Sequence, residues 1–205
     1  MTDLIICVAT EMEGALLRPH LPVIITGVGA VNAAIALTRF LAAQQAKAVV
    51  VCGIGGGYPG ADLPVGSVAW AETECYGDLG ANSAGGFLDM RALGFPVIAG
   101  PEPVYNVLPL QIVPERRLVP FVTVNTCTGD NASALALAAR TGGGVENMEG
   151  AAIAHVARLF GLRAGEVRGI SNPVGNRDRA AWRVKDAAVA AQEALLAAWR
   201  NGELA

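Results

Sequence analysis

The chain has 205 residues, of which 53% are hydrophobic and 16% charged, and its formal net charge is −3. This length suits one domain with one core, so we expect a single domain over residues 1–205. The sequence has no basic cluster and no apolar run of the roughly 18 residues that a membrane helix needs, which argues against nucleic acid and membranes as partners.

The low content of charged residues and the spacing of the cysteines indicate how the surface is covered and in which compartment the protein works. Much of the surface must be small, apolar or covered by another subunit, so we expect a homo-oligomer, a dimer or larger. The first residues, MTDLIICVATEMEG, lack the basic segment of a signal peptide. The four cysteines are widely spaced without a C-x-x-C pair, which favours reduced thiols in the cytoplasm. A small molecule is the expected partner.

Short unalternating apolar runs, typical of strands buried on both faces, recur along the chain. We expect strands over 4–9, 22–27, 48–53, 66–72, 120–126 and 166–171. Segments rich in alanine and leucine at helical spacing predict helices over 30–45, 149–160 and 178–200. Together these elements predict an α/β fold, a three-layer α/β/α sandwich.

Two acids follow the first expected strand. Glu11 and Glu13 lie where a helix should begin, and acids in a first turn stabilise the helix dipole by ~0.3–1 kcal/mol. Ligands also bind at the carboxyl ends of strands in α/β folds. One of the two carboxylates could therefore face a cleft.

Glycine-rich segments follow the next two expected strands. The segment 27–34, GVGAVNAA, has Asn32 where a dinucleotide fingerprint has its third glycine, and we expect only a tight strand-to-helix turn there. The segment 51–60, VCGIGGGYPG, lacks the Gly-Lys-Ser/Thr of a phosphate loop. We interpret it as a loop that either receives a sugar or phosphate or simply turns the chain.

The segment 80–117 is rich in glycine and proline and too irregular for further core elements. We expect it to be a functional loop or a subunit-contact segment.

Two acids also lie where a glycine run gives way to the helix expected over 149–160. In GGGVENMEGAAIAHVARLFG, Asn147 can cap the helix and Glu149 falls in its first turn. Glu146 lies three residues before Glu149, near enough to share a side if the turn is helical. Capping explains one acid better than two.

Polar residues also follow the last expected strand. Ser171, Asn172 and Arg177 lie in a loop where they could meet a ligand, although an Asn-Pro turn is the structural alternative. The two histidines have no further ligands at metal spacing, so we expect neither a metal nor a cofactor. Carboxylates and an amide are the best candidates for chemistry.

Taken together, ATEMEGALL, CGIGGG, CTGDN, VENMEGAAIAHV and VRGISNPVGNRD resemble the purine nucleoside phosphorylase and nucleosidase superfamily from end to end of the chain. Among its hydrolytic members the resemblance is greatest to the futalosine hydrolase family, related to methylthioadenosine nucleosidase. It implies a mixed, barrel-like central sheet and hydrolysis of an N-glycosidic bond. The reaction expected for this family releases hypoxanthine and dehypoxanthine futalosine from futalosine, in menaquinone biosynthesis.

The resemblance also implies roles for single residues. Glu13 would position or deprotonate the attacking water, as one catalytic residue. Glu149 would bind the two ribosyl hydroxyls and stabilise the oxocarbenium ion, with Met148 against the sugar. The other residues that would line the pocket are Ile54, Gly55, Asn147 and Ser171.

The chain departs from the methylthioadenosine nucleosidase pattern at Asn172, where that pattern has aspartic acid. An amide does not titrate, but it offers both a donor and an acceptor, which complements the oxo group and ring N–H of a 6-oxopurine. Asn172 therefore indicates hypoxanthine rather than adenine as the leaving base, and is the second expected catalytic residue. The aromatic residue that stacks on the base in that pattern is missing too, and some other residue, for example Phe87 or Tyr105, would have to cover the purine.

Three alternatives stay open. A purine nucleoside phosphorylase would need phosphate-binding side chains, which CGIGGGYPG lacks, although Arg18, Arg39 and Arg91 could come from elsewhere. A methylthioadenosine or aminodeoxyfutalosine nucleosidase would release adenine. A non-catalytic nucleoside-binding module would need the pocket without the base.

Overall fold

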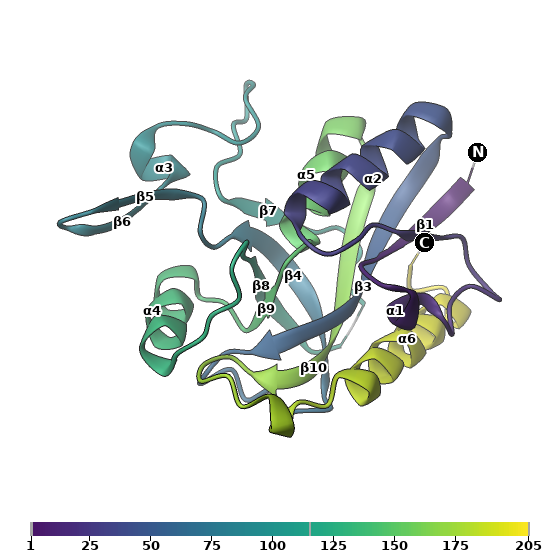
Figure 1. Ribbon diagram of the computed structural model, residues 1–205. Helices are drawn as coiled ribbons and strands as arrows, with labels where there is room; N and C mark the ends of the chain where they lie inside the picture. The colour runs from purple at the N-terminus through teal and green to yellow at the C-terminus, as the bar shows by residue number, and fades with distance from the viewer. Residues whose placement is uncertain (1, 115, 205) are drawn as a thin grey trace.

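The computed structural model describes residues 2–114 and 116–204, and a mixed sheet that closes on itself forms its centre (Figure 1). The strands of this sheet in the described part of the chain are β1 (Thr2–Val8), β2 (Val23–Ile25), β3 (Ala46–Gly57), β4 (Val68–Tyr76), β7 (Val107–Pro109), β8 (Leu118–Thr123), β9 (Val145–Asn147) and β10 (Arg163–Pro173). Their order is β10-β4-β8-β9-β3-β1-β2, and β7 pairs with β4. Because β10 also pairs with β3, five strands form a closed ring, and the expected mixed, barrel-like sheet is confirmed.

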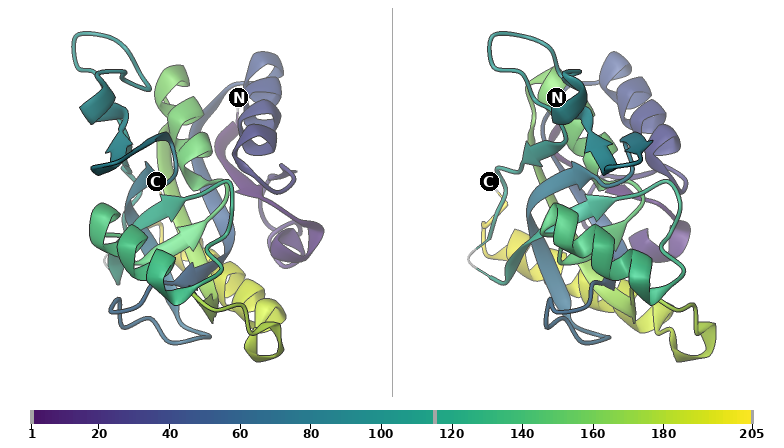
Figure 2. Two further views of the ribbon diagram at one scale, coloured as in Figure 1. Left: turned by 60° about the vertical axis from the view of Figure 1, so that its left-hand side comes forward. Right: turned by 90° about the vertical axis from the view of Figure 1, so that its left-hand side faces the viewer.

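Helices cover the sheet from two sides. They are α1 (Glu11–Gly14), α2 (Ala30–Ala43), α3 (Met90–Leu93), α4 (Asn131–Thr141), α5 (Gly150–Phe160) and α6 (Val184–Arg200), with a 3₁₀ turn at Arg179–Ala181. Helices α2 and α5 pack side by side, whereas α6 lies against β10 and β3 with α1 beside it (Figures 1 and 2). The predicted three-layer α/β/α arrangement is therefore confirmed. None of the helices in the described residues has the length and apolarity to cross a membrane.

Two apolar cores lie on the two sides of the sheet. Leu37 of α2 and Ile153 of α5 belong to one, and Leu17 and Leu195 of the α1 and α6 side belong to the other. Because both faces of β1 and β3 are covered, both faces must be apolar. This explains why LIICVA and AVVVC do not alternate.

The glycine segment after residue 53 is part of a strand, so its interpretation as a loop was wrong. Strand β3 continues to Gly57 and pairs with β10 on one side and with β9 on the other. A Cβ on Gly55 would lie 2.6 Å from Val145 Cγ1 and 2.9 Å from the carbonyl oxygen of Glu146. Glycine is needed here because it lets neighbouring strands approach closely enough to close the barrel.

The segment 80–117 is partly ordered into elements. Strands β5 (Gly80–Ser83) and β6 (Gly86–Asp89) form a hairpin that projects from the body of the molecule with α3 (Figure 1). The expectation that no core element lies here was wrong for β7, which pairs with β4 and buries Leu108. A strand of three residues is too short to show a pattern.

Other boundaries also differ from the expected ones. Helix α4 and strand β9 were not predicted, although Asp130 caps α4 by accepting a hydrogen bond from the Ser133 N–H. Helix α6 begins at Val184 rather than at residue 178. Residues 120–123 belong to β8 as expected, but this strand begins at Leu118 and ends at Thr123.

The contact between β10 and α6 is tight enough to exclude a side chain at Gly169. A Cβ there would lie 2.0 Å from the carbonyl oxygen of Ala187, which is backbone and cannot move alone. We predict that Gly169→Ala lowers the free energy of unfolding by ~1–3 kcal/mol or more, as overpacking does. Chemical denaturation measures it. Gly85→Ala is the control, because the nearest atom to its Cβ is Ser83 Oγ at 3.8 Å, and equal effects of both substitutions would contradict this packing.

Candidate active site

A cavity of about 260 Å³ opens where β1, β3, β9 and β10 end and α5 begins. This is near the lower end of the ~300–1,000 Å³ typical of ligand pockets. The residues that the sequence predicted for the site all line it, namely Glu13, Ile54, Gly55, Asn147, Met148, Glu149, Ser171 and Asn172. The fold thus gathers four distant segments at one place. The roles of these residues stay predictions.

The two acids after β1 have different surroundings. Glu13 is 3% exposed and lines the cavity, where Oε1 accepts a hydrogen bond from the Ile54 N–H at 3.0 Å and Oε2 accepts one from Thr10 Oγ1 at 2.7 Å. Glu11 is exposed and forms a surface ion pair with Arg18. The expectation that one of the two faces a cleft is therefore confirmed, and that acid is Glu13.

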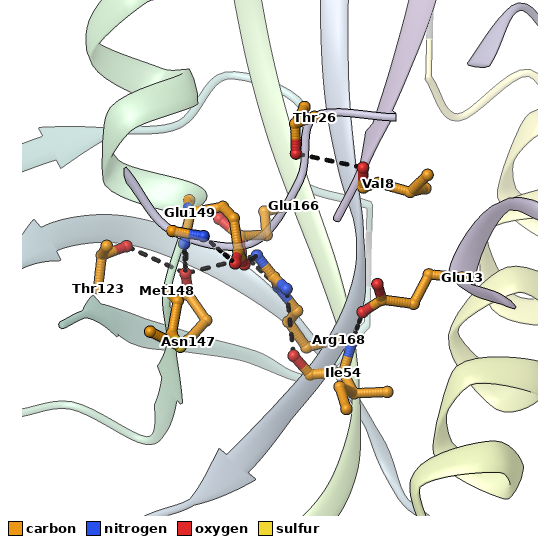
Figure 3. Close-up of polar contacts among 12 residues, drawn as sticks. Val8, Glu13, Thr26, Ile54, Thr123, Asn147, Met148, Glu149, Glu166 and Arg168 are labelled. Carbon is orange, nitrogen blue, oxygen red and sulfur yellow. Dashed lines mark hydrogen bonds and ion pairs between the residues drawn. The ribbon is translucent and has the colours of Figure 1, made fainter. Parts of the chain in front are cut away.

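Glu149 is held from two sides at the opposite wall (Figure 3). Its Oε1 accepts a hydrogen bond from the Gly29 N–H at 3.0 Å, and its Oε2 lies 3.2 Å from Arg168 Nη2. Gly29 has φ +98°, a conformation that side chains rarely adopt, so glycine directs this N–H toward the acid. Glu149 occupies the N-cap position of α5 and makes no side-chain cap, so its expected place in the first turn was wrong by one residue.

Asn147 caps helix α5, as predicted. Its Oδ1 accepts hydrogen bonds from the N–H groups of Glu149 at 2.9 Å and Gly150 at 2.8 Å. Thr123 Oγ1 accepts from the next free amide, that of Ala151, at 2.8 Å. Because these two side chains satisfy the helix amides, the Glu149 carboxylate stays available to the cavity.

Arg168 lies between Glu13 and Glu149 and was missed by the sequence reading (Figure 3). It is 2% exposed, and its Nε donates to Glu166 Oε1 at 2.7 Å while Nη1 donates to the Ile54 carbonyl oxygen at 3.1 Å. Burial alone would lower the pKa of Arg168, but the carboxylates of Glu166, Glu149 and Glu13 outweigh it and raise this pKa. The signal was present, since Glu166 and Arg168 are two charges on one face of an apolar strand.

Gly53 explains how Glu13 and Arg168 both lie against β3. A Cβ at this position would lie 2.6 Å from Glu13 Oε1 and 2.7 Å from Arg168 Nη1. The absent side chain thus leaves room for both charged groups over the strand.

Glu146, the other acid before α5, has a structural role. Its Oε2 accepts hydrogen bonds from the Tyr58 hydroxyl at 2.8 Å and from Thr128 Oγ1 at 2.5 Å, and its Oε1 accepts from the Thr128 N–H at 2.9 Å. Burial, and then the carboxylate, raise the pKa of Tyr58, which stays a donor. Glu146 therefore ties β9 to the loop that carries Cys127 and Thr128 in the cavity wall.

The far end of the cavity is built from Asn172, near the end of β10, and from Arg177 and Trp182, which follow this strand. Asn172 Oδ1 accepts from Ser171 Oγ at 2.7 Å and its Nδ2 donates to the Pro173 carbonyl oxygen at 2.9 Å, which leaves the amide one lone pair and one N–H. The Arg177 guanidinium lies 5.0 Å from the centroid of the Trp182 ring. This end therefore offers a planar surface and a cation beside an amide.

The aromatic and cationic residues named from the sequence lie elsewhere in this chain. Phe87 stacks with Arg140 and Tyr105 with Arg91, and neither aromatic residue lines the cavity. The cations suggested for a phosphate, Arg18, Arg39 and Arg91, are also outside the cavity wall. Trp182, which was not predicted from the sequence, is the one aromatic residue among the described residues that line the cavity.

Sequence comparisons show which family the chain resembles. The model of the phosphorylase superfamily matches residues 13–200. The chain is 37% identical to a futalosine hydrolase of Thermus thermophilus over 83% of its own length and 77% of the relative's. It is also 37% identical to a futalosine hydrolase of Acidothermus cellulolyticus, over 95% and 86% of the two chains.

Solved structures show the same fold. A futalosine hydrolase of Helicobacter pylori superposes with a TM-score of 0.80 at 15% identity, over 98% of both chains. A 5'-methylthioadenosine/S-adenosylhomocysteine nucleosidase of Neisseria meningitidis in complex with methylthio-immucillin-A has a TM-score of 0.78 at 17% identity, over 95% of this chain and 97% of the other.

Proposed function

Because the chain belongs to the phosphorylase superfamily, and within it to the futalosine hydrolase family, we propose that it hydrolyses the N-glycosidic bond of futalosine. The products are hypoxanthine and dehypoxanthine futalosine, and the reaction belongs to menaquinone biosynthesis. The observation that carries the proposal is one cavity with the carboxylates of Glu13 and Glu149 on either side of the buried Arg168. A binding module without chemistry would not need a second acid on the far side of the sugar site.

The sugar half of the site is formed by Glu149 and Met148. Each oxygen of the Glu149 carboxylate keeps a lone pair after its contact with Gly29 or Arg168, so the acid can accept hydrogen bonds from two ribosyl hydroxyls. Its negative charge stabilises the oxocarbenium ion that develops as the glycosidic bond breaks. Met148, next to it in the wall, packs against the sugar.

Glu13 activates the water. Thr10 and the Ile54 N–H fix its carboxylate, and it lies in the wall on the other side of Arg168 from Glu149. A water between Glu13 and the anomeric carbon gives up its proton to this carboxylate as it adds. Ile54 and Gly55, on the strand between the two acids, run past the ribose.

The base half is formed by Asn172, Ser171 and Trp182. The Ser171 hydroxyl orients the Asn172 amide, whose remaining N–H and lone pair complement the oxo group and ring N–H of hypoxanthine. Trp182 covers the purine face, and Arg177 beside it favours the negative charge that develops on the leaving base.

Hydrolysis fits the site better than phosphorolysis does. Arg168, the cation nearest the sugar, is already engaged by two carboxylates and the Ile54 carbonyl oxygen. Around it the wall carries carboxylates, which repel inorganic phosphate. The glycine segment that could have cradled a phosphate is a paired strand.

We also propose that residues 1–205 form one nucleosidase domain that works in the cytoplasm as a homo-oligomer. Both of the adjacent helices α2 and α5 carry exposed apolar side chains, among them Val31 at 69% and Leu159 at 62% exposure. Exposed apolar side chains of this size favour burial against a second copy. The cysteines form no disulfide, as suits a reducing compartment.

A substrate panel tests the reaction. The purified protein is incubated with futalosine, inosine and methylthioadenosine, each with and without phosphate, and the released base and sugar are identified. We predict hypoxanthine and dehypoxanthine futalosine from futalosine, at a rate that phosphate does not change. A sugar phosphate formed only with phosphate would establish phosphorolysis, and the absence of any release would favour a binding module.

Glu13→Gln tests the base. The amide keeps the size of the carboxylate but accepts no proton, so kcat should fall by ~10²–10⁴-fold. Glu11→Gln, which changes the exposed neighbour, should leave kcat unchanged. Near-normal turnover by Glu13→Gln would remove Glu13 from this role.

Asn172→Asp tests base recognition. An aspartic acid can protonate a departing adenine but cannot donate from an amide to a 6-oxo group, so kcat/KM for futalosine should fall by ~100-fold while adenine release from methylthioadenosine rises. Asn176→Asp, four residues further along the chain and outside the cavity wall, is the control. If the preference between the two bases stays as in the wild type, Asn172 does not set it.

A further inference from the structure

A second pair of acids lies in the barrel interior, below the sugar half of the site. Glu74 on β4 is fully buried and Glu166 on β10 is 1% exposed. Their oxygens meet at Gly150, because a Cβ there would lie 2.1 Å from Glu166 Oε2 and 2.2 Å from Glu74 Oε1. The two carboxyl groups therefore face each other, and neither lines the cavity. The mechanism above uses neither of them.

The charges around the pair can balance one negative charge on it. Among the buried side chains that the structure describes, Arg168 is the one cation, and it contacts both Glu166 and Glu149. Glu74 contacts neutral groups instead, accepting hydrogen bonds from Thr123 Oγ1 at 2.9 Å and from Asn147 Nδ2. Two ionised carboxylates in contact inside a protein repel each other strongly, so one of them keeps a proton.

The proton belongs on Glu74. Burial and the charge of Glu166 raise the pKa of Glu74 well above its ordinary value. Burial also raises the pKa of Glu166, but Arg168 opposes this rise by stabilising its charged form. The other titratable groups near Glu74 are Tyr76 and Cys75, whose pKa values are raised by burial, so both stay neutral.

An otherwise unpartnered atom points the same way. Glu166 Oε2 is buried and has no hydrogen-bond partner among the described residues. A buried acceptor without a donor costs ~1–3 kcal/mol. A proton on Glu74 Oε1, directed at Glu166 Oε2, removes this cost.

We propose that Glu74 and Glu166 share one proton and act as a positioning pair that holds Glu149 in place for the ribose. Two paths lead from the pair to that acid. Glu74 accepts from Asn147, whose Oδ1 holds the Glu149 N–H at 2.9 Å. Glu166 accepts from Arg168, whose Nη2 lies 3.2 Å from the Glu149 carboxylate. The pair thus holds the backbone of Glu149 through Asn147 and its carboxylate through Arg168.

The proposal rests on the proposed function for its kinetic part, and two variants of Glu74 test it. Glu74→Gln keeps the shape, and its amide can donate to Glu166 and accept from Thr123, whereas the hydrogen bond from Asn147 is lost. Glu74→Met keeps a similar volume without these hydrogen bonds. Glu72→Gln, on the exposed side of the same strand, is the control.

Infrared spectroscopy of the protein without substrate detects the proton directly. We expect the wild type and Glu72→Gln to show the carbonyl band of a buried protonated carboxylic acid at neutral pH, shifted in D₂O, and both Glu74 variants to lack it. A wild type without this band, or a Glu74→Gln variant that keeps it, would overturn the shared proton. Because this measurement needs no turnover, it also holds if futalosine proves not to be the substrate.

Kinetics on the substrate found by the panel test the positioning. We expect Glu74→Gln, which keeps two of the three hydrogen bonds, to lose less than about tenfold in kcat/KM, and Glu74→Met, which keeps none, to lose about tenfold to a hundredfold. Circular dichroism checks that each variant is folded. Equal losses in both variants, or full activity of a folded Glu74→Met, would overturn the positioning role. If Glu74→Met does not fold, the activity of Glu74→Gln and the infrared band decide.

Discussion

One buried guanidinium holds the site together. Arg168 joins Glu166 below the cavity to Glu149 in its wall and donates to the carbonyl oxygen of Ile54. A cation in the interior is stable only when carboxylates and hydrogen-bond acceptors surround it, and the acids are stable there only because the cation is present. Each member therefore depends on the others. A chain with only 16% charged residues concentrates several of its charges at this point because they share one counter-ion.

The closed sheet makes this arrangement possible. Strand β3 closes the sheet, because one of its edges pairs with β10. Its other edge pairs with β1 over the first part of the strand and with β9 at its end. In the same segment, Gly55 allows the neighbouring strand to approach and Gly53 leaves space for Glu13 and Arg168. The fold and the site thus both require glycine in VCGIGGG. For this reason the segment has the composition of a loop but the conformation of a strand.

Much of the fold could be predicted from apolar runs, because strands covered on both faces are apolar throughout. Short elements such as β7 and β9 could not, since three residues carry no period. The residues assigned from family motifs all line one cavity. Arg168 stands in the motif VRGISNPVGNRD but was given no role, and the motifs do not contain Glu74 or Glu166. These groups matter through pairing across strands, and a single sequence does not show which buried charges face each other. Trp182 was missed because nothing in its local pattern separates a cavity aromatic from a helix-flanking one.

The two halves of the cavity are built from different parts of the chain. The sugar half depends on the barrel interior and the start of α5, whereas the base half depends on the end of β10 and the turn that follows it. Under the proposed function, a substitution at residue 172 or 182 changes contacts to the base without touching the buried charges. Base preference and sugar chemistry are then carried by separate parts of the chain, and one can change while the other is kept.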